Sequence, residues 1–208
     1  MKQKGMPEET CINRSTIGIT ITTRSIIIIT EAINTIKIDK WGKPPLFNIQ
    51  ISMKILIFSD SHGDTKRMIK ALKTEREVHF IAHLGDYYED LDNALQSVDL
   101  HLPVISVCGN MDHENGFFRR PSFEEHVFCG KKALFLHGNT FARAGEVDFE
   151  FVKREYGKYD LVLFGHTHTQ LLFADRKPVL FNPGTISKGQ YGVVTITENS
   201  ILCEHKQK

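Results

Sequence analysis

The chain has 208 residues, which is enough for one ordinary α/β domain with a short appendage. Its 26 Lys and Arg residues nearly balance 25 Asp and Glu residues, so the formal net charge is +1. This balance gives no broad field to attract extended nucleic acid or a membrane surface, and an anionic substrate has to be held locally. The Ile-rich stretch Ile26–Ile29 lies between Arg24 and Glu31, so we expect no transmembrane span. Four cysteines without a CxxC spacing favour a reducing, cytoplasmic setting.

The first 52 residues differ in character from the rest. Ile and Thr dominate residues 1–52 without a clear period, and Lys43-Pro44-Pro45 interrupts them. We expect residues 1–52 to be an N-terminal extension outside the native protein, with Met53 as the natural start and residues 53–208 as the domain. Mass spectrometry of the native N-terminus tests this expectation, and peptides from before Met53 would contradict it.

Strands and helices are predicted to alternate in the first part of the domain. Lys54–Phe58 is a short apolar run typical of a buried strand, and a turn over Ser59–Gly63 follows it. Asp64–Thr74 has apolar residues at helical spacing and an acidic start that suits a helix N-terminus. The alternation continues with a strand at Val78–Leu84, a helix at Asp90–Val98 and a strand at Val104–Val107. This order implies parallel strands joined by right-handed crossovers.

The chain becomes richer in strands beyond Gly109. Gly130 separates Glu124–Cys129 from Lys132–Leu136, a pattern that predicts a hairpin. One further helix is expected at Val147–Tyr156. Other strands are predicted at Leu161–Phe164, Leu171–Ala174, Val179–Phe181, Gly192–Thr197 and Ile201–His205. We therefore expect an α/β sandwich with two sheets and the helices outside.

Potential metal ligands follow the predicted strands. Asp60 and His62 come directly after the first strand, Asp86 after the second and Asn110 after the third. The set is completed by His137, after Lys132–Leu136, and by His166 and His168, after Leu161–Phe164. Because the carboxyl ends of adjacent parallel strands share one edge of a sheet, we expect the seven side chains to converge on one crevice.

The types of these side chains indicate a cation of intermediate hardness. Carboxylate and amide oxygens combined with imidazole nitrogens suit Mn²⁺, Fe²⁺, Zn²⁺, Ni²⁺ or Co²⁺ better than Ca²⁺ or Mg²⁺ alone, and Mn²⁺ is our first expectation. Seven ligands are too many for one catalytic ion, whereas two ions that share a carboxylate would use all of them. The spacing of His166 and His168 would put both rings on one side of an extended segment, with one ring aimed at each ion.

Taken one at a time, these residues have duller explanations. Asp60 or Asp86 could cap the following helix, Asn110 could favour a turn, and a single His is usually structural. Seven such residues at strand ends favour the metal site instead. The duller explanation is preferred elsewhere: Phe117-Phe118 and Phe123 are expected in the core, His83 as a structural residue, and Asn182-Pro183-Gly184-Thr185 as a turn near the site.

Five short motifs together resemble a known family. They are Asp60-Ser61-His62, Gly85-Asp86, Gly109-Asn110-Met111-Asp112, His137-Gly138 and Gly165-His166-Thr167-His168. In this order they resemble the calcineurin-like metallophosphoesterase superfamily, and the small size is similar to that of its compact YfcE-type phosphodiesterase branch. The resemblance covers Met53 to the C-terminus. It implies a four-layer α/β/β/α sandwich of two mixed sheets and hydrolysis of phosphate esters.

The resemblance also implies roles for individual residues. Asp86 would bridge two metal ions, of which the first is completed by Asp60, His62 and His168 and the second by Asn110, His137 and His166. A hydroxide bridging the ions would attack phosphorus, with Asp86 and Asn110 as the catalytic residues and Asn110 also contacting a phosphate oxygen. Asp112 is expected not to bind metal itself but to fix an imidazole or the loop.

The chain departs from the family pattern at two positions. Many members have a His where this chain has Met111, and Met cannot donate a proton to a leaving group. The compact branch commonly lacks this His as well, and His113 is a possible substitute acid. Related proteins often have His-Gly-His where this chain has His137-Gly138-Asn139, so Asn139 is expected to hydrogen-bond a substrate oxygen or a ligand.

Two other functions remain open on sequence grounds. One is a protein-binding scaffold on the same fold, and the other is a nuclease, which would be expected to carry an added domain and a basic tract that are not visible here. For the enzyme we expect a small phosphodiester or phosphomonoester as substrate. The oligomeric state stays open, with a homodimer possible.

Overall fold

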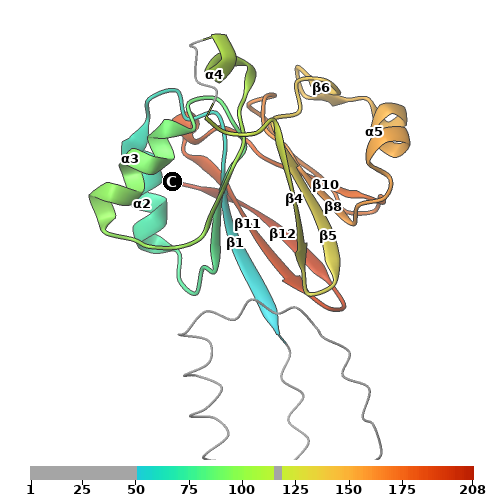
Figure 1. Cartoon of the computed structure of the whole chain (residues 1–208), viewed down its shortest axis with the longest axis horizontal. Coiled ribbons are helices and arrows are strands. Elements are labelled where there is room, and N and C mark those ends of the chain that lie inside the picture. The colour runs from blue at the N-terminus through green and yellow to red at the C-terminus, as the bar shows by residue number, and fades with distance from the viewer. Residues whose placement is uncertain (1–50, 115–118) are drawn as a thin grey trace, which may run out of the picture. The chain divides into compact units, whose positions relative to one another are not determined.

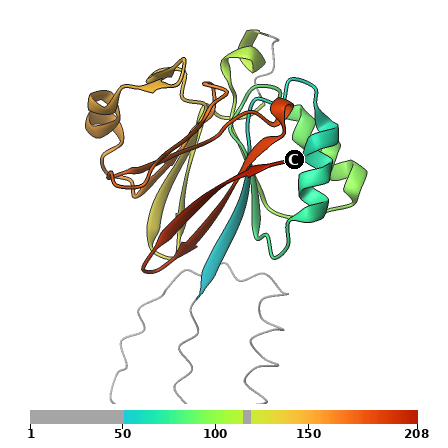
Figure 2. The same cartoon turned by 180° about the vertical axis from the view of Figure 1, so that it is seen from behind.

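Residues 51–114 and 119–208 are described by the structure, which is a computed structural model (Figure 1). In this part of the chain, two five-stranded sheets pack face to face, with α2 (Thr65–Thr74) and α3 (Glu89–Val98) outside the first sheet. Helix α5 (Phe149–Tyr156) lies outside the second sheet, as the reverse view also shows (Figure 2). The predicted α/β/β/α arrangement of two mixed sheets is thereby confirmed. No helix among the described residues is long and apolar enough to cross a membrane.

The first sheet carries the alternation of strands and helices. Its strands, in spatial order, are β12 (Ile201–Gln207), β11 (Gln190–Thr197), β1 (Ser52–Phe58), β2 (Phe80–His83) and β3 (Val104–Ser106). The pairs β1–β2 and β2–β3 are parallel, as predicted, and β11 is antiparallel to both β1 and β12. Phe58 lies opposite His83, and His83 lies opposite Ser106. The three loops that follow these residues therefore leave the sheet side by side.

The second sheet has the strand order β4 (Phe123–Phe128), β5 (Lys131–Leu136), β8 (Leu161–Leu163), β10 (Val179–Pro183) and β9 (Gln170–Phe173). β4 and β5 form the predicted hairpin, and β8 is parallel to β5 and β10. The Gly165 N–H donates to the carbonyl of His137 over 2.9 Å, so the loops after β5 and β8 also lie together. A smaller antiparallel pair, β6 (Ala142–Arg143) and β7 (Glu146–Val147), precedes α5.

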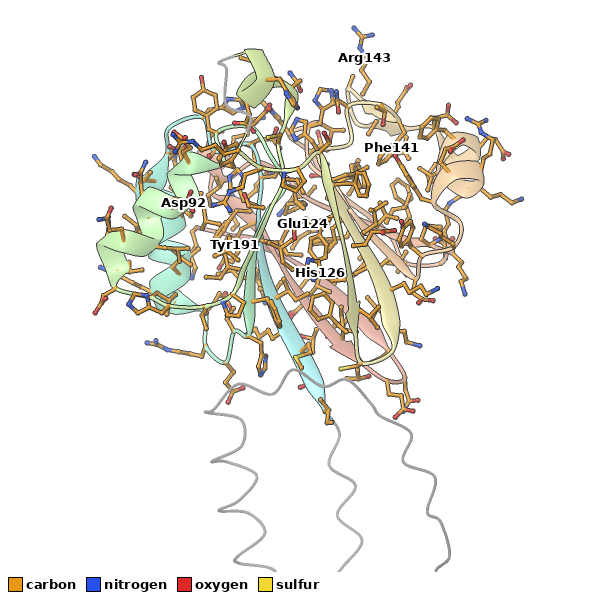
Figure 3. The ribbon with its side chains drawn as sticks, viewed as in Figure 1. Asp92, Glu124, His126, Phe141, Arg143 and Tyr191 are labelled. Atoms are coloured by element: carbon orange, nitrogen blue, oxygen red, sulfur yellow. The ribbon has the colours of Figure 1, made fainter. Side chains whose placement is uncertain are left out.

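Alternation of apolar side chains explains how the layers pack. Ile55, Ile57, Ala133 and Phe135 face the core between the sheets, whereas the intervening Leu56 faces the helices. Tyr191 of β11 is also buried under the helices, where its hydroxyl donates to Glu75 over 3.0 Å (Figure 3). Each sheet thus buries one face against the other sheet and one against helices, which is the physical basis of the four layers.

Most predicted elements occur within a few residues of their expected bounds. The expected helix Val147–Tyr156 begins at Phe149, because Val147 pairs with Ala142 and the Asp148 carboxylate caps the helix by accepting the Phe151 N–H. Two short helices, α4 (Asn110–Glu114) and η1 (Ile186–Lys188), were not predicted. Phe117-Phe118 and residues 1–50 of the expected extension lie outside the described residues.

Candidate metal centre

Five candidate ligands have a left-handed backbone, which is uncommon for residues other than glycine. The φ angles are 53° for Asp60, 47° for His62, 59° for Asp86, 67° for His166 and 54° for His168. Such a conformation typically costs about 1–3 kcal/mol and persists only where the surroundings impose it. Backbone strain is therefore concentrated in the three loops that carry these residues.

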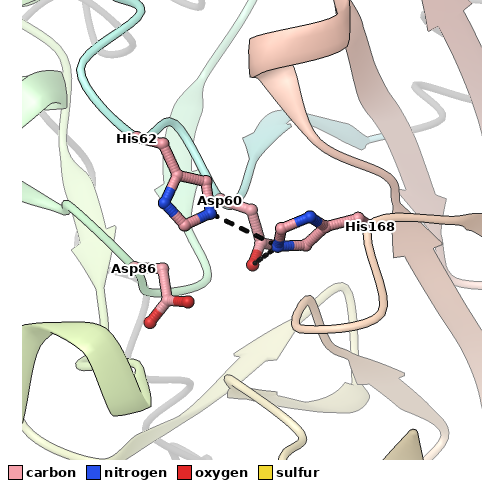
Figure 4. A group of neighbouring side chains, drawn as sticks. All are labelled: Asp60, His62, Asp86 and His168. Carbon is pink, nitrogen blue, oxygen red and sulfur yellow. Dashed lines mark hydrogen bonds and ion pairs between the residues drawn. The ribbon is translucent and has the colours of Figure 1, made fainter. Parts of the chain in front are cut away.

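Four candidate ligands form the first group. One nitrogen or oxygen from each of Asp60, His62, Asp86 and His168 lies within 4.8 Å of every other (Figure 4). Nε2 of His168 is 3.1 Å from Oδ1 of Asp60 and 3.3 Å from Nε2 of His62. Both carboxylates are buried, whereas His62 is exposed and His168 is partly exposed. The carboxylates therefore form the buried floor of this group, and the two imidazole rings face solvent.

The remaining candidate ligands form a second group that meets the first at Asp86. Oδ1 of Asn110 is 3.2 Å from Nε2 of His137 and 3.1 Å from Nδ1 of His166. Nε2 of His137 is also 3.4 Å from Oδ2 of Asp86. All seven predicted residues are thus brought together in two groups, and the Asp86 carboxylate lies in both.

Hydrogen bonding orients the buried ring of His137. Its Nδ1 lies 2.7 Å from the Leu84 carbonyl oxygen, so Nδ1 donates a proton there and Nε2 faces the site. Burial lowers the pKa of His137, but the hydrogen bond with Asp86 and the nearby carboxylates outweigh it, and the pKa lies above its usual value. For Asp86, burial raises the pKa, yet His137 and the Met111 N–H bring it below its usual value. The pair therefore favours an ionised Asp86.

The two partly exposed histidines of the Gly165–His168 loop differ from each other. The pKa of His166 is lowered, chiefly by burial and then by the nearby His137. The pKa of His168 is raised, chiefly by its contact with the Asp60 carboxylate. The segment is not extended as predicted, because both residues have positive φ and the Thr167 N–H donates to the Gly165 carbonyl over 2.8 Å. The ring of His168 still lies in the first group and that of His166 in the second, and a turn, not the alternation of a strand, separates the two rings.

Asp112 organises the backbone beneath the site. Its Oδ2 accepts the N–H groups of Asp86, over 2.9 Å, and Gly109, over 2.7 Å, while its Oδ1 accepts the Tyr87 N–H over 2.6 Å. Asp112 is fully buried. Of the two roles considered for it, fixing the loop agrees with these contacts, and its carboxylate holds the loops after β2 and β3 together.

Glycine is required where these loops approach one another. A Cβ on Gly165 would lie 1.9 Å from Oγ of Ser59 and 2.9 Å from Oδ2 of Asp60. A Cβ on Gly109 would lie 2.1 Å from Oδ1 of Asp86. Either contact is far too short for a real side chain, so the carboxylates can occupy their positions only because glycine stands opposite them.

His113 and Asn139, which were expected to contact the substrate or its leaving group, border a pocket of about 480 Å³. Asn110 and His137 line one part of its wall, and the exposed side chains of His113 and Asn139 also line it. These two residues therefore lie beside the second group. Phe123 lines the same pocket with 56% of its surface exposed, so its predicted place in the core was wrong. It begins an edge strand and points away from the core between the sheets.

Three further residues support the ligand loops, of which two belong to the turn expected near the site and one, Asp90, was not predicted. The Thr185 hydroxyl donates to the Asp60 carbonyl over 2.6 Å, and Asn182 donates to the Gly165 carbonyl over 2.6 Å. Asp90 accepts the Ser61 hydroxyl over 2.7 Å. The turn signal around Pro183 pointed to the first two, whereas Asp90 resembles an ordinary acidic residue in the first turn of a helix and gave no signal of its own.

Comparison with known proteins gives a consistent family. The model described as the calcineurin-like phosphoesterase superfamily domain matches residues 53–199. A probable metallophosphoesterase of Methanothermobacter thermautotrophicus is 30% identical over 112 residues, which are 53% of this chain and 62% of that protein. The matched part therefore spans less than two thirds of that relative.

Solved structures share the fold at low identity. An archaeal protein described as a novel phosphodiesterase is 20% identical with a TM-score of 0.55, over 75% of this chain and 100% of that chain. Vps29 from Entamoeba histolytica, complexed with Zn²⁺, is 15% identical with a TM-score of 0.52, over 74% of this chain and 99% of that chain. At these identities the likeness shows the fold alone.

Proposed function

The chain belongs to the calcineurin-like phosphoesterase superfamily, and on this premise we propose that it is a phosphodiesterase that uses two divalent metal ions. The observation that carries the proposal is the position of Asp86, whose carboxylate lies in both groups of candidate ligands. A shared carboxylate between two sets of nitrogen and oxygen donors is the arrangement that two-metal hydrolysis needs.

The first group fits a cation on the chemistry of its atoms. Oδ1 of Asp60 is buried and lacks a hydrogen bond of regular geometry, and its nearest partner is Nε2 of His168, 3.1 Å away as an ion pair. Nε2 of His62 also points to this place, 3.3 Å from that of His168. Buried polar atoms normally have partners, and a cation would satisfy the carboxylate and both nitrogens at once. We assign Asp60, His62, Asp86 and His168 to the first ion.

The second group offers a similar set of donors. Asn110, His137 and His166 provide an amide oxygen and imidazole nitrogens, and Asp86 provides a carboxylate. These donors suit Mn²⁺, our first choice, and also Ni²⁺, Co²⁺, Fe²⁺ or Zn²⁺. The Zn²⁺ complex of Vps29 from Entamoeba histolytica supports a metal site in this fold but does not select the metal for this chain.

The metal ions and the side chains of the centre would have separate roles in hydrolysis. Divalent ions held here would lower the pKa of bound water and offset charge on the transferring phosphoryl group. The surroundings of Asp86 keep its carboxylate ionised. The hydrogen bond from Nδ1 of His137 to the Leu84 carbonyl orients Nε2 toward the site, and the Asp112 carboxylate holds the loops in place. The Asn110 amide could donate to a phosphate oxygen from its other end. Because Met111 supplies no proton, we expect esters with good leaving groups to react fastest.

The scaffold alternative is less favoured. Vps29 from Entamoeba histolytica shares the fold, yet binding of a protein partner alone would not require two groups of candidate metal-binding side chains in strained loops. A nuclease is not supported either, because the formal net charge of +1 gives no overall positive field to attract a long polyanion.

Hydrolysis by metal-stripped protein with single metals restored tests the proposal. Bis-p-nitrophenyl phosphate and p-nitrophenyl phosphate are compared with Mn²⁺, Ni²⁺, Co²⁺, Zn²⁺ or Mg²⁺ added separately. We expect activity to return with a transition metal and to favour the diester. Failure of every metal to restore cleavage in folded protein would contradict the proposal and return the scaffold to first place.

A further inference from the structure

The pocket beside the second ligand group has a wall built by the outer face of the second sheet. Leu134 and Leu136 line it, and both belong to the apolar cluster between this sheet and α5. Phe123 lies opposite Leu136 in the β4–β5 pair, and Leu136 immediately precedes His137. The apolar wall therefore leads directly to a candidate metal ligand. A volume of about 480 Å³ lies within the usual range of small-molecule sites.

Three aromatic rings line this pocket. Tyr156, at the end of α5, and the nearly buried Tyr159 contribute on one side, and the half-exposed ring of Phe123 contributes on the other. Phe123 lies in an edge strand with 56% of its surface exposed, so its ring is open to a ligand. Rings arranged around a pocket favour a flat, weakly polar group that can stack on them.

The polar residues of the pocket favour a neutral ligand group. Lys158 and Glu155 both line it, but Lys158 is paired with Glu125 over 3.3 Å and Glu155 with Arg154 over 2.8 Å, so each charge is offset by a partner outside the lining. Ser122, Asn139 and Thr140 also line it, and their hydroxyl and amide groups can both donate and accept hydrogen bonds. A second phosphate would find no net positive charge here, whereas hydroxyls and ring nitrogens would find partners.

We propose that this pocket binds the organic part of the substrate, and that this part is a nucleoside with a planar base and sugar hydroxyls. The phosphate would lie at the metal centre and the base against Phe123. This inference rests on the proposed function, because it takes the phosphate position from the candidate metal centre. It adds a substrate class that the metal ligands alone do not specify.

Calorimetric binding to the Mn²⁺-loaded full chain tests the inference without requiring turnover. Adenosine 5′-monophosphate is compared with ribose 5-phosphate, which has the same sugar and phosphate but no base. We expect the nucleotide to bind at least about tenfold more tightly, as stacking of one base on an aromatic ring commonly achieves. Phe123→Ala should remove most of this difference and leave the affinity for ribose 5-phosphate unchanged, whereas Phe123→Tyr should keep it.

Val127→Ala is the matched control. Val127 lies on the same strand and is 66% exposed, but it does not line the pocket. Val127→Ala should bind adenosine 5′-monophosphate and ribose 5-phosphate with the same affinities as the wild type. The nucleoside site would be overturned if the wild type bound adenosine 5′-monophosphate and ribose 5-phosphate equally well, or if Phe123→Ala kept the full preference for the nucleotide. Either result would leave a metal-dependent phosphate centre intact. If adenosine 5′-monophosphate, ribose 5-phosphate and inorganic phosphate all fail to bind in a Mn²⁺-dependent way, the proposed function itself fails.

Discussion

Asp112 shows how one buried side chain can position several parts of the centre. Its two carboxylate oxygens accept three backbone N–H groups from two loops. An amide at this position would keep one acceptor oxygen and direct an NH₂ group at a backbone N–H. We expect Asp112→Asn to lower the free energy of unfolding by about 1–3 kcal/mol and to weaken Mn²⁺ binding by about 10–100-fold.

Chemical denaturation and Mn²⁺ titration measure the two effects of Asp112→Asn. Asp99→Asn is the control, since Asp99 is exposed and its left-handed backbone is one that Asn adopts readily. It should change neither quantity. Unaltered Mn²⁺ affinity in Asp112→Asn would show that the loop contacts do not position the ligands.

His83 gives the protein a specific acid sensitivity. Its side chain is fully buried, with Nε2 3.3 Å from the Ser61 hydroxyl, and burial lowers its pKa to about 4 against the opposing charge of Asp60. Between this value and the unfolded pKa of about 6.5, the unfolded chain binds the proton more readily. The contribution to stability is therefore complete above about pH 6.5 and is lost as the pH falls toward 4.

Replacing His83 should reduce this pH dependence. In metal-free protein, we expect the free energy of unfolding of His83→Gln to fall about 2–3 kcal/mol less than that of the wild type between pH 7 and pH 4.5. Urea denaturation at several pH values measures it, with His101→Gln as an exposed control. Parallel curves for the wild type and His83→Gln would contradict a neutral, buried imidazole.

Among the elements, those with a strong periodic pattern were predictable and those without it were not. β1 and β2 are apolar runs that bury both faces, and α2 has an apolar stripe and an acidic cap at Asp64. The five residues of α4 and the three of η1 are too short for a period and depend on contacts with distant segments. The loop of His166 was predicted as extended because alternation was assumed where a tight turn occurs.

The candidate ligands were predictable for a different reason from their supports. Each ligand follows a strand with a clear pattern, so its place at the sheet edge follows from parallel topology. Asp90 and Thr185 act through contacts with Ser61 and Asp60, which are 29 and 125 residues away in sequence. No local pattern encodes such contacts. The assigned roles of the ligands remain predictions.

The capping of α5 can be tested separately from the metal centre. The Asp148 carboxylate accepts the Phe151 N–H over 3.0 Å, on the outer layer of the second sheet. We expect Asp148→Ala to lower the free energy of unfolding by about 1 kcal/mol without changing Mn²⁺ affinity. Glu150→Ala, in the same first turn, should have a smaller effect on denaturation. Loss of metal binding in Asp148→Ala would show that α5 and the centre are coupled.

At the scale of the whole chain, the predicted superfamily is confirmed, and the four-layer fold agrees with its solved structures. The motifs allowed this because five of them occur in order, each at a strand end. The balanced charge of the chain agrees with a small substrate held by local contacts. The native start at Met53 stays a prediction, as does the reducing setting expected from the cysteines.

A chain that begins at Met53 should retain the properties of the domain. β1 begins at Ser52, which pairs with Thr197, so the shorter chain loses one pair at the end of the strand far from Asp60. We expect Mn²⁺ affinity to stay within about twofold and the free energy of unfolding within about 1 kcal/mol. A chain that begins at Ile57 lacks most of β1 and should not fold. Failure of the Met53 chain to fold would show that earlier residues belong to the domain.

Elemental analysis after metal stripping and reconstitution measures how many Mn²⁺ ions each chain binds, and this number tests whether Asp86 joins two metal sites. We expect two ions in the wild type and in Asp92→Asn, an Asp→Asn control in α3. We expect one ion or none in folded Asp86→Asn, with hydrolysis of bis-p-nitrophenyl phosphate reduced at least about hundredfold. A single ion in the wild type, or two ions and full activity in Asp86→Asn, would contradict a two-metal centre bridged by Asp86.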